Sequence, residues 1–231
     1  MFNKDSNNQV ILKGVISGDF EPQESDYGVF FETSIKVLRL SGECDELRLN
    51  LPECMARGKE VGSEIAVLGQ FRSRNVIRDG KSRLELVVFA LSELDPSSVE
   101  ERSSNIVMLS GFICKPTSIR TTPFGREIAD LLVAVNRGHK KSDYLPCIAW
   151  STNARVSSEL VVGDAIDIVG RIQSRKYQKK DFDGNILSKV AYEVSITKIS
   201  TSTDKVYANT SKIKEYFSGI LENLSVKYNM S

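Results

Sequence analysis

Residues that could perform catalysis or hold a metal are sparse in this chain of 231 residues. His139 is the only histidine, and the four cysteines, which form no C-x-x-C pair, are Cys44, Cys54, Cys114 and Cys147. A zinc site needs clustered His and Cys ligands, and a Ser-His-Asp triad would have to include His139. Neither phosphate-loop motif, G-x-x-x-x-G-K-[ST] or G-x-G-x-x-G, occurs. The sequence therefore predicts a protein with no catalytic residues, no metal site and no cofactor.

The residues that could act on a ligand are basic and aromatic, and they gather in the second half of the chain. Residues 175–180 read Arg-Lys-Tyr-Gln-Lys-Lys, and residues 144–150 read Tyr-Leu-Pro-Cys-Ile-Ala-Trp. Residues 1–103 hold 13 Lys and Arg against 18 Asp and Glu, a net charge of −5, whereas residues 104–200 hold 14 against 9, a net charge of +5. A basic half beside an acidic one indicates a polyanionic partner for the basic half.

The two halves of the chain are versions of each other. Residues 61–75 and 162–176 share the pattern VG-x3-(apolar)-x-(apolar)-G-x-(apolar)-x-SR, with an offset of 101. Residues 8–16 match residues 105–113 with an offset of 97. The offset grows between the matching blocks, as expected when insertions fall in loops. A repeat of about a hundred residues is typical of a duplicated domain.

Each repeat has the pattern of a small all-β barrel. Alternating apolar residues indicate strands, residues 21–28 and 115–125 indicate loops, and Asp-Gly pairs at 79–80 and 183–184 indicate hairpin tips. Helical spacing occurs before the fourth strand, over residues 52–57 in one copy and 152–160 in the other. Five strands with one helix in that place are the order of an OB-fold. We therefore expect an all-β protein of two tandem five-stranded OB-fold barrels, each with one short helix.

These patterns predict an N-terminal OB domain (1–95), a polar linker (96–104), a C-terminal OB domain (105–200) and a tail (201–231). In the tail, apolar residues recur at helical spacing after the possible N-cap Thr210-Ser211 and predict an amphipathic C-terminal helix: Ile213, Phe217, Ile220, Leu221 and Leu224. The helix could pack on its own barrel or dock on a partner. No apolar run approaches the roughly 20 residues of a membrane span, and the N-terminus lacks a secretory pattern. We expect a soluble, cytoplasmic protein with reduced cysteines.

Two stretches of the second repeat have a recognisable pattern: residues 105–111 read N-x-V-x-L-x-G, and residues 128–135 form an apolar strand. In these stretches, which are similar to the opening strand and the second strand of the family, the second repeat resembles the bacterial single-stranded DNA-binding (SSB) proteins. Residues 144–150 fall where the family has W-x-x-x-x-x-F/W, and residues 170–177 resemble G-x-L-x-T/S-R-x-W/Y. The match is strong over residues 105–199. In the first repeat it is partial, carried by the first strand and the VG…SR block.

The resemblance implies a non-enzymatic protein that binds single-stranded DNA without strong sequence preference, in DNA replication, recombination or repair. Tyr144, Trp150 and Tyr177 stand where the family stacks bases. The residues placed to contact phosphates are Arg137, Lys140, Lys141, Arg171, Arg175, Lys176, Lys179 and Lys180. His139 falls where many members have tryptophan. The resemblance also implies a nucleoid-associated protein, a homodimer that supplies four OB domains, and replication or recombination proteins as further partners.

The first repeat departs from the family pattern at the positions of the stacking residues. Leu49, or Asn50 after a one-residue shift, replaces Trp150, and Val76 replaces Tyr177. With the −5 net charge, these departures predict a poor DNA surface, and we expect the first domain to serve assembly or partner contact. The chain also ends Ser-Val-Lys-Tyr-Asn-Met-Ser rather than in the family's acidic tip, so recruitment through such a tip is not expected.

Two other functions fit an OB-fold chain of this kind. One is an interaction scaffold, akin to a primosomal or conjugation accessory factor, whose main partner is another protein. The other is a metal-dependent nuclease, which would need convergent carboxylates. Asp181 and Asp183 are the only close pair of acidic residues in the basic domain that could supply them.

Overall fold

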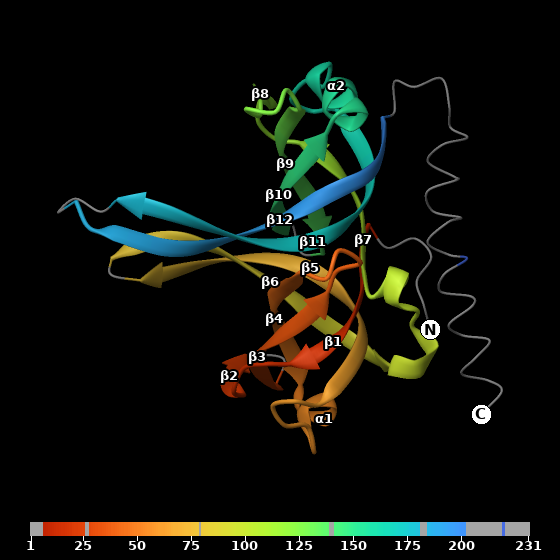
Figure 1. Cartoon of the computed structure of the whole chain (residues 1–231). Helices are drawn as coiled ribbons and strands as arrows, with labels where there is room; N and C mark the ends of the chain where they lie inside the picture. Colours follow the sequence, from red (N-terminus) through yellow and green to blue (C-terminus); the bar gives the residue numbers. More distant parts are fainter. Residues whose placement is uncertain are drawn as a thin grey trace.

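The structure is a computed structural model that describes residues 7–25, 28–78, 80–138, 141–180, 184–201 and 219. Its strands form one continuous sheet that curls into two barrels (Figure 1). Barrel 1 consists of β1 (Asn8–Ile16), β3 (Gly28–Leu38), β4 (Cys44–Pro52), β5 (Glu64–Arg78) and β6 (Lys81–Leu94). Barrel 2 consists of β7 (Asn105–Ile113), β9 (Glu127–Arg137), β10 (Lys141–Trp150), β11 (Ala165–Lys180) and β12 (Ile186–Thr201).

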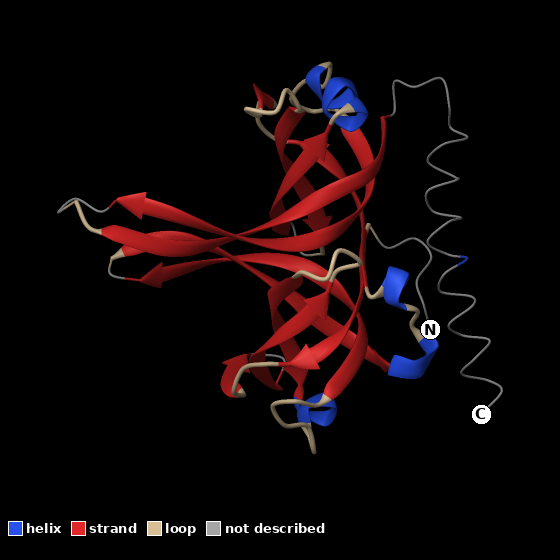
Figure 2. Cartoon of the chain, viewed as in Figure 1, coloured by secondary structure: helices blue, strands red, loops and turns tan. Residues whose placement is uncertain are grey.

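The order of strands is the same in both barrels and is that of an OB-fold. Neighbours run β1-β3-β4-β6-β5 and back to β1 in barrel 1, and β7-β9-β10-β12-β11 and back to β7 in barrel 2. The pairs β4–β6 and β10–β12 are parallel. One short helix precedes the fourth strand of each barrel, α1 (Glu53–Ala56) or α2 (Thr152–Ser158), and the two helices lie at opposite ends of the molecule (Figure 2). The prediction of two tandem OB-folds is therefore confirmed.

A glycine in the first strand lets each barrel close. A Cβ at Gly14 would lie 2.3 Å from the Lys36 carbonyl oxygen of β3. At the equivalent Gly111 it would lie 2.5 Å from the Ala134 carbonyl oxygen of β9. Because no side chain fits in that space, glycine allows the first strand to pair with the second strand as well as the fourth. These two glycines therefore make the contact that closes each barrel.

The barrels join through their first strands. Strands β1 and β7 pair antiparallel, with Val10 opposite Val107, which is its own counterpart in the repeat. A pair of equivalent residues facing each other places a local two-fold axis between the barrels, as in an isologous interface. Beside this seam, a small apolar cluster is contributed by both barrels and by Val99. The two barrels therefore form one pseudo-symmetric unit and not two separate domains.

The structure differs from the expected elements in three places. Residues 21–28 and 115–125 were expected as loops but contain short strands, β2 (Glu21–Ser25) and β8 (Ser118–Thr121), which lengthen the sheets at β3 and β9. The expected linker 96–104 forms two 3-10 turns, η1 (Pro96–Ser98) and η2 (Glu101–Ser103), and it buries Val99. The expected C-terminal helix falls on tail residues outside the described ranges.

Candidate nucleic-acid interface

Strand β10 turns two aromatic rings outward because its residues alternate between the two faces of the sheet. Leu145, Cys147 and Ala149 point into the core of barrel 2 and are at most 3% exposed. Tyr144 and Trp150 point the other way and keep 47% and 37% of their surface exposed. Alternation along β10 thus leaves both rings accessible to a ligand.

The hairpin of β11 and β12 adds a third ring to the same face. The pairing of Ile172 with Val194 and of Val194 with Cys147 puts these three buried residues on the inner face. Residues of β11 that are an odd number of positions from Ile172 therefore lie on the outer face. Tyr177 is one of them and is 37% exposed. The Arg175 guanidinium carbon lies 5.9 Å from the centre of the Tyr177 ring. We call Tyr144, Trp150, Tyr177 and Arg175 the aromatic face.

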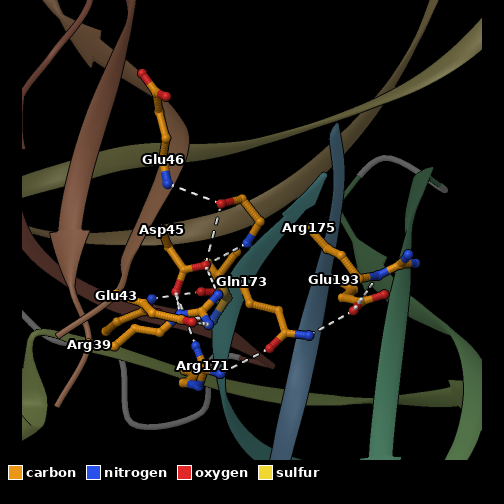
Figure 3. A network of polar contacts seen from close by, with 11 residues as sticks. Arg39, Glu43, Asp45, Glu46, Arg171, Gln173, Arg175 and Glu193 are labelled. Carbon is orange, nitrogen blue, oxygen red and sulfur yellow. Dashed lines mark hydrogen bonds and ion pairs between the residues drawn. The ribbon is translucent and has the colours of Figure 1, made fainter. Parts of the chain in front are cut away.

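Two of the expected phosphate-binding arginines are engaged at the seam between the barrels. The Arg171 Nη1 donates to Asp45 Oδ2 of barrel 1 at 3.0 Å, and its Nη2 donates to Gln173 Oε1 (Figure 3). Burial, followed by the nearby charge of Arg39, lowers the pKa of Arg171. Arg137 bonds both oxygens of Asp143, and its Nη2 donates to the Ser73 carbonyl oxygen of barrel 1 at 3.1 Å.

These contacts belong to two matching carboxylate centres. Asp45, which is 1% exposed, accepts from Arg39 Nε and from the backbone N–H of Ser174, each at 2.7 Å (Figure 3). Its hydrogen bond raises the pKa of Arg39. Asp143, which is 2% exposed, accepts from the Ser73 backbone N–H at 2.7 Å. In each centre a carboxylate on one barrel satisfies an edge N–H on the other. The sequence analysis missed this role, although Asp45 and Asp143 are equivalent positions with an offset of 98.

The other expected phosphate-binding residues are spread over β10, β11 and segments outside the described residues. Lys141 starts β10 and Lys176 lies in β11, and both are exposed. Arg175 is 53% exposed and lies 3.6 Å from Glu193. Lys179 and Lys180 are the last residues of β11, and the structure describes their backbone alone. His139, Lys140 and the pair Asp181 and Asp183 fall outside the described residues.

Barrel 1 has different residues at the positions of the three rings. Strand register aligns Tyr144 with Glu46 and Tyr177 with Val76. It aligns Trp150 with Pro52, because Pro52 pairs with Phe30 as Trp150 pairs with Ile128. The sequence comparison, which put Leu49 or Asn50 at this position, was therefore wrong by two or three residues. Two arginines on this face are held by carboxylates, in a network of Arg48, Arg74, Glu32 and Glu85.

Comparison with known proteins agrees with this geometry. Residues 104–202 match the single-strand binding protein family. The match covers the second barrel and not the first, and we call barrel 2 the SSB barrel after the family that it matches. Its members are binding proteins and not enzymes, as the sequence predicts. Among similar proteins are single-stranded DNA-binding protein 2 of Listeria innocua, 33% identical over 84 residues, and single-stranded DNA-binding protein A of Bacillus subtilis, 32% identical over 83. Each alignment covers 33% of this chain, and 53% and 48% of the respective relatives, so the chain spans about half the length of the curated relatives it matches.

A solved structure extends the likeness beyond the SSB barrel. The crystal structure of the wild-type single-stranded DNA-binding protein from Thermus aquaticus matches with a TM-score of 0.62 and 23% identity. The match covers 85% of this chain and 93% of that one, so both barrels take part. This likeness supports the tandem fold. Among the described residues, no helix could span a membrane, and no group of three His, Cys, Asp or Glu side chains could hold a metal ion.

The cysteines of the SSB barrel are expected to react more slowly than those of barrel 1. Burial raises the pKa of Cys147, which is 3% exposed, and also that of Cys114. Cys44 and Cys54 are exposed free thiols. Because the thiolate is the reactive form, we expect iodoacetamide at neutral pH to label Cys44 and Cys54 first and Cys147 only after unfolding. Peptide mass spectrometry over time checks this order, and early labelling of Cys147 would contradict the described packing.

Proposed function

We propose that this protein binds single-stranded DNA without strong sequence preference, mainly on the aromatic face of the SSB barrel. The observation that carries the proposal is that Tyr144, Trp150 and Tyr177 share one outer face and are each at least 37% exposed. Bases stack on aromatic rings whatever their sequence, because every base has a π-face. A structural role in the core would have buried these rings instead.

Phosphate contacts come from cations on the strands that carry this face. Lys141 and Lys176 are exposed, and neither forms an ion pair with another described residue. They neutralise phosphates and release counterions, so that affinity falls as salt rises. Arg175 can join them, because its pairing with Glu193 at 3.6 Å leaves 53% of its side chain exposed. Lys140, Lys179 and Lys180 extend the same role along the adjoining loop and hairpin. Arg137 and Arg171 act mainly by holding the barrels in place, because carboxylates already occupy their guanidinium groups.

The cellular role that follows is protection of single strands during DNA replication, recombination or repair, in the cytoplasm at the nucleoid.

Two chains in a homodimer would supply four OB barrels to one DNA strand. Light scattering of the purified protein tests the assembly, with a dimer as the expected result and a stable monomer as the contrary one.

Trp150 provides a direct assay of the proposed function because it is the only tryptophan in the chain. We expect oligo-dT to quench its fluorescence, and the affinity to fall as NaCl is raised from about 50 to about 200 mM. A blunt duplex of equal length serves as the control and should quench little at the higher salt. Absence of quenching, or an affinity that ignores salt, would rule out binding on this face.

A further inference from the structure

Barrel 1 carries an aromatic cluster that the binding face of barrel 2 does not explain. The rings of Phe30 on β3 and Phe89 on β6 lie with their centres 4.9 Å apart and are tilted by 53°. The guanidinium carbon of Arg72 on β5 lies 4.9 Å from the centre of the Phe89 ring. All three side chains are partly exposed on the outer face of barrel 1. We call Phe30, Phe89 and Arg72 the barrel 1 platform.

Arg72 differs from the other arginines at the seam because no described carboxylate pairs with it. Its hydrogen bonds go to the neutral amide oxygen of Gln70. In the carboxylate centre around Asp45, by contrast, Arg171 pairs with Asp45 at 3.0 Å. Burial, and then the charge of Arg137, lowers the pKa of Arg72, and the charge of Asp143 opposes this only in part. A half-buried guanidinium over a ring, with no described carboxylate at ion-pair distance, is an arrangement that an anion would stabilise.

A second polar group on this face also lacks a partner. Asn50 on β4 is 8% exposed, and its Oδ1 accepts no hydrogen bond from any described residue. Strand pairing places Asn50 beside Phe89, on β4, which lies between the strands that carry the two rings. A buried acceptor left unpaired destabilises the fold, and a ligand donor would relieve this. The N–H groups on a base edge are donors of this kind.

The platform is continuous with the aromatic face of barrel 2. Ser73 follows Arg72 directly, and its Oγ accepts from the backbone N–H of Tyr144 at 2.8 Å. The Arg137 Nη2 reaches the Ser73 carbonyl oxygen from the same side. Arg72 and Tyr144 are therefore neighbours across the seam, joined through Ser73. The acidic residue at this place, Asp143, is 2% exposed and already bonded by Arg137 and Ser73.

We propose that the barrel 1 platform is a second single-stranded DNA subsite, which takes the nucleotides that run on from Tyr144 across the seam. A base stacks on Phe89 and Phe30, Arg72 contacts the phosphate beside it, and the Asn50 amide oxygen accepts a base N–H. This site rests on the proposed function of barrel 2 and extends it to a barrel in which Glu46, Pro52 and Val76 occupy the positions of the three rings.

Strand length and two variants of the full chain test the subsite. Oligo-dT of about 8 nucleotides occupies one OB-fold, and oligo-dT of about 30 reaches both. With the longer strand, we expect Phe89→Leu to lower affinity about fivefold or more. We expect Arg72→Gln to make the slope of log K against log salt less steep by about 0.7. Arg57→Gln, which removes an equal charge from the 80% exposed Arg57 at the α1 end, should do neither.

Trp150 quenching by the short strand separates this proposal from the one on which it rests. The expected result is that both variants leave quenching by the short strand unchanged and bind the long strand more weakly. If the variants bind the long strand like the unchanged protein, the subsite is refuted while binding on barrel 2 stands. If the short strand produces no quenching in the unchanged protein, the function proposed for barrel 2 fails first. Unchanged melting temperatures verify that both variants fold.

Discussion

Replacing Tyr144 and Tyr177 together by leucine lowers the affinity for oligo-dT by about 30-fold or more. Each stacked base contributes about 1–3 kcal/mol, and leucine keeps apolar volume but removes the flat π-surface. The two rings lie on different strands, β10 and β11, so their contributions should add approximately. The measurement is quenching of Trp150, which both replacements leave in place.

The matched control for this pair is Val76→Ala, at the position of barrel 1 that corresponds to Tyr177. Its affinity for oligo-dT should equal that of the unchanged protein. Should the two tyrosine replacements bind as tightly as the control, stacking on Tyr144 and Tyr177 would have no part in binding. The affinity would then have to come from Trp150 and the cations.

Replacing Asp45 by alanine should reduce the free energy of unfolding by about 3 kcal/mol. The carboxylate is 1% exposed and bonds Arg39, Arg171 and the Ser174 backbone N–H. Removing one partner of a buried ion pair leaves the other charges uncompensated, which costs roughly 3–5 kcal/mol. We take the lower end because Arg39 and Arg171 keep 22% and 33% of their side-chain surface exposed. Urea unfolding followed by circular dichroism measures the loss.

Glu43→Ala is the control for Asp45, since Glu43 pairs with the same arginine but is 71% exposed. An exposed pair contributes about 0–1 kcal/mol, so this variant should unfold nearly like the unchanged protein. Equal midpoints for the two variants would show that the seam does not depend on its buried carboxylate. The barrels would then be held mainly by the β1–β7 pairing and the apolar cluster around Val99.

The repeat made most of the fold predictable, because strand periodicity and the helix before the fourth strand are local signals. The two-residue alternation that puts Tyr144 and Trp150 on one side of β10 is a local signal of the same kind. The register between the repeats was harder. Pro52 replaces Trp150, and only the pairing of both with the strand before them reveals the correspondence.

The contacts across the seam could not be read from local patterns. Arg137 and Arg171 look like free cations in the sequence, and their partners across the seam, Ser73 and Asp45, are 64 and 126 residues away. The only sequence signal was that an aspartate recurs at positions 45 and 143 in an otherwise diverged block. The barrel 1 platform was missed for a similar reason, since Phe30 and Phe89 meet only when β4 lies between their strands.

Photo-crosslinking gives the most direct test of where single-stranded DNA lies on this protein. Oligo-dT carrying 5-iodouracil is irradiated with the full chain, and the modified residues are mapped by mass spectrometry. Binding on the aromatic face predicts crosslinks at Tyr144, Trp150 and Tyr177. Crosslinks confined to aromatic residues away from the outer faces of the two barrels, with these three unmodified, would contradict it.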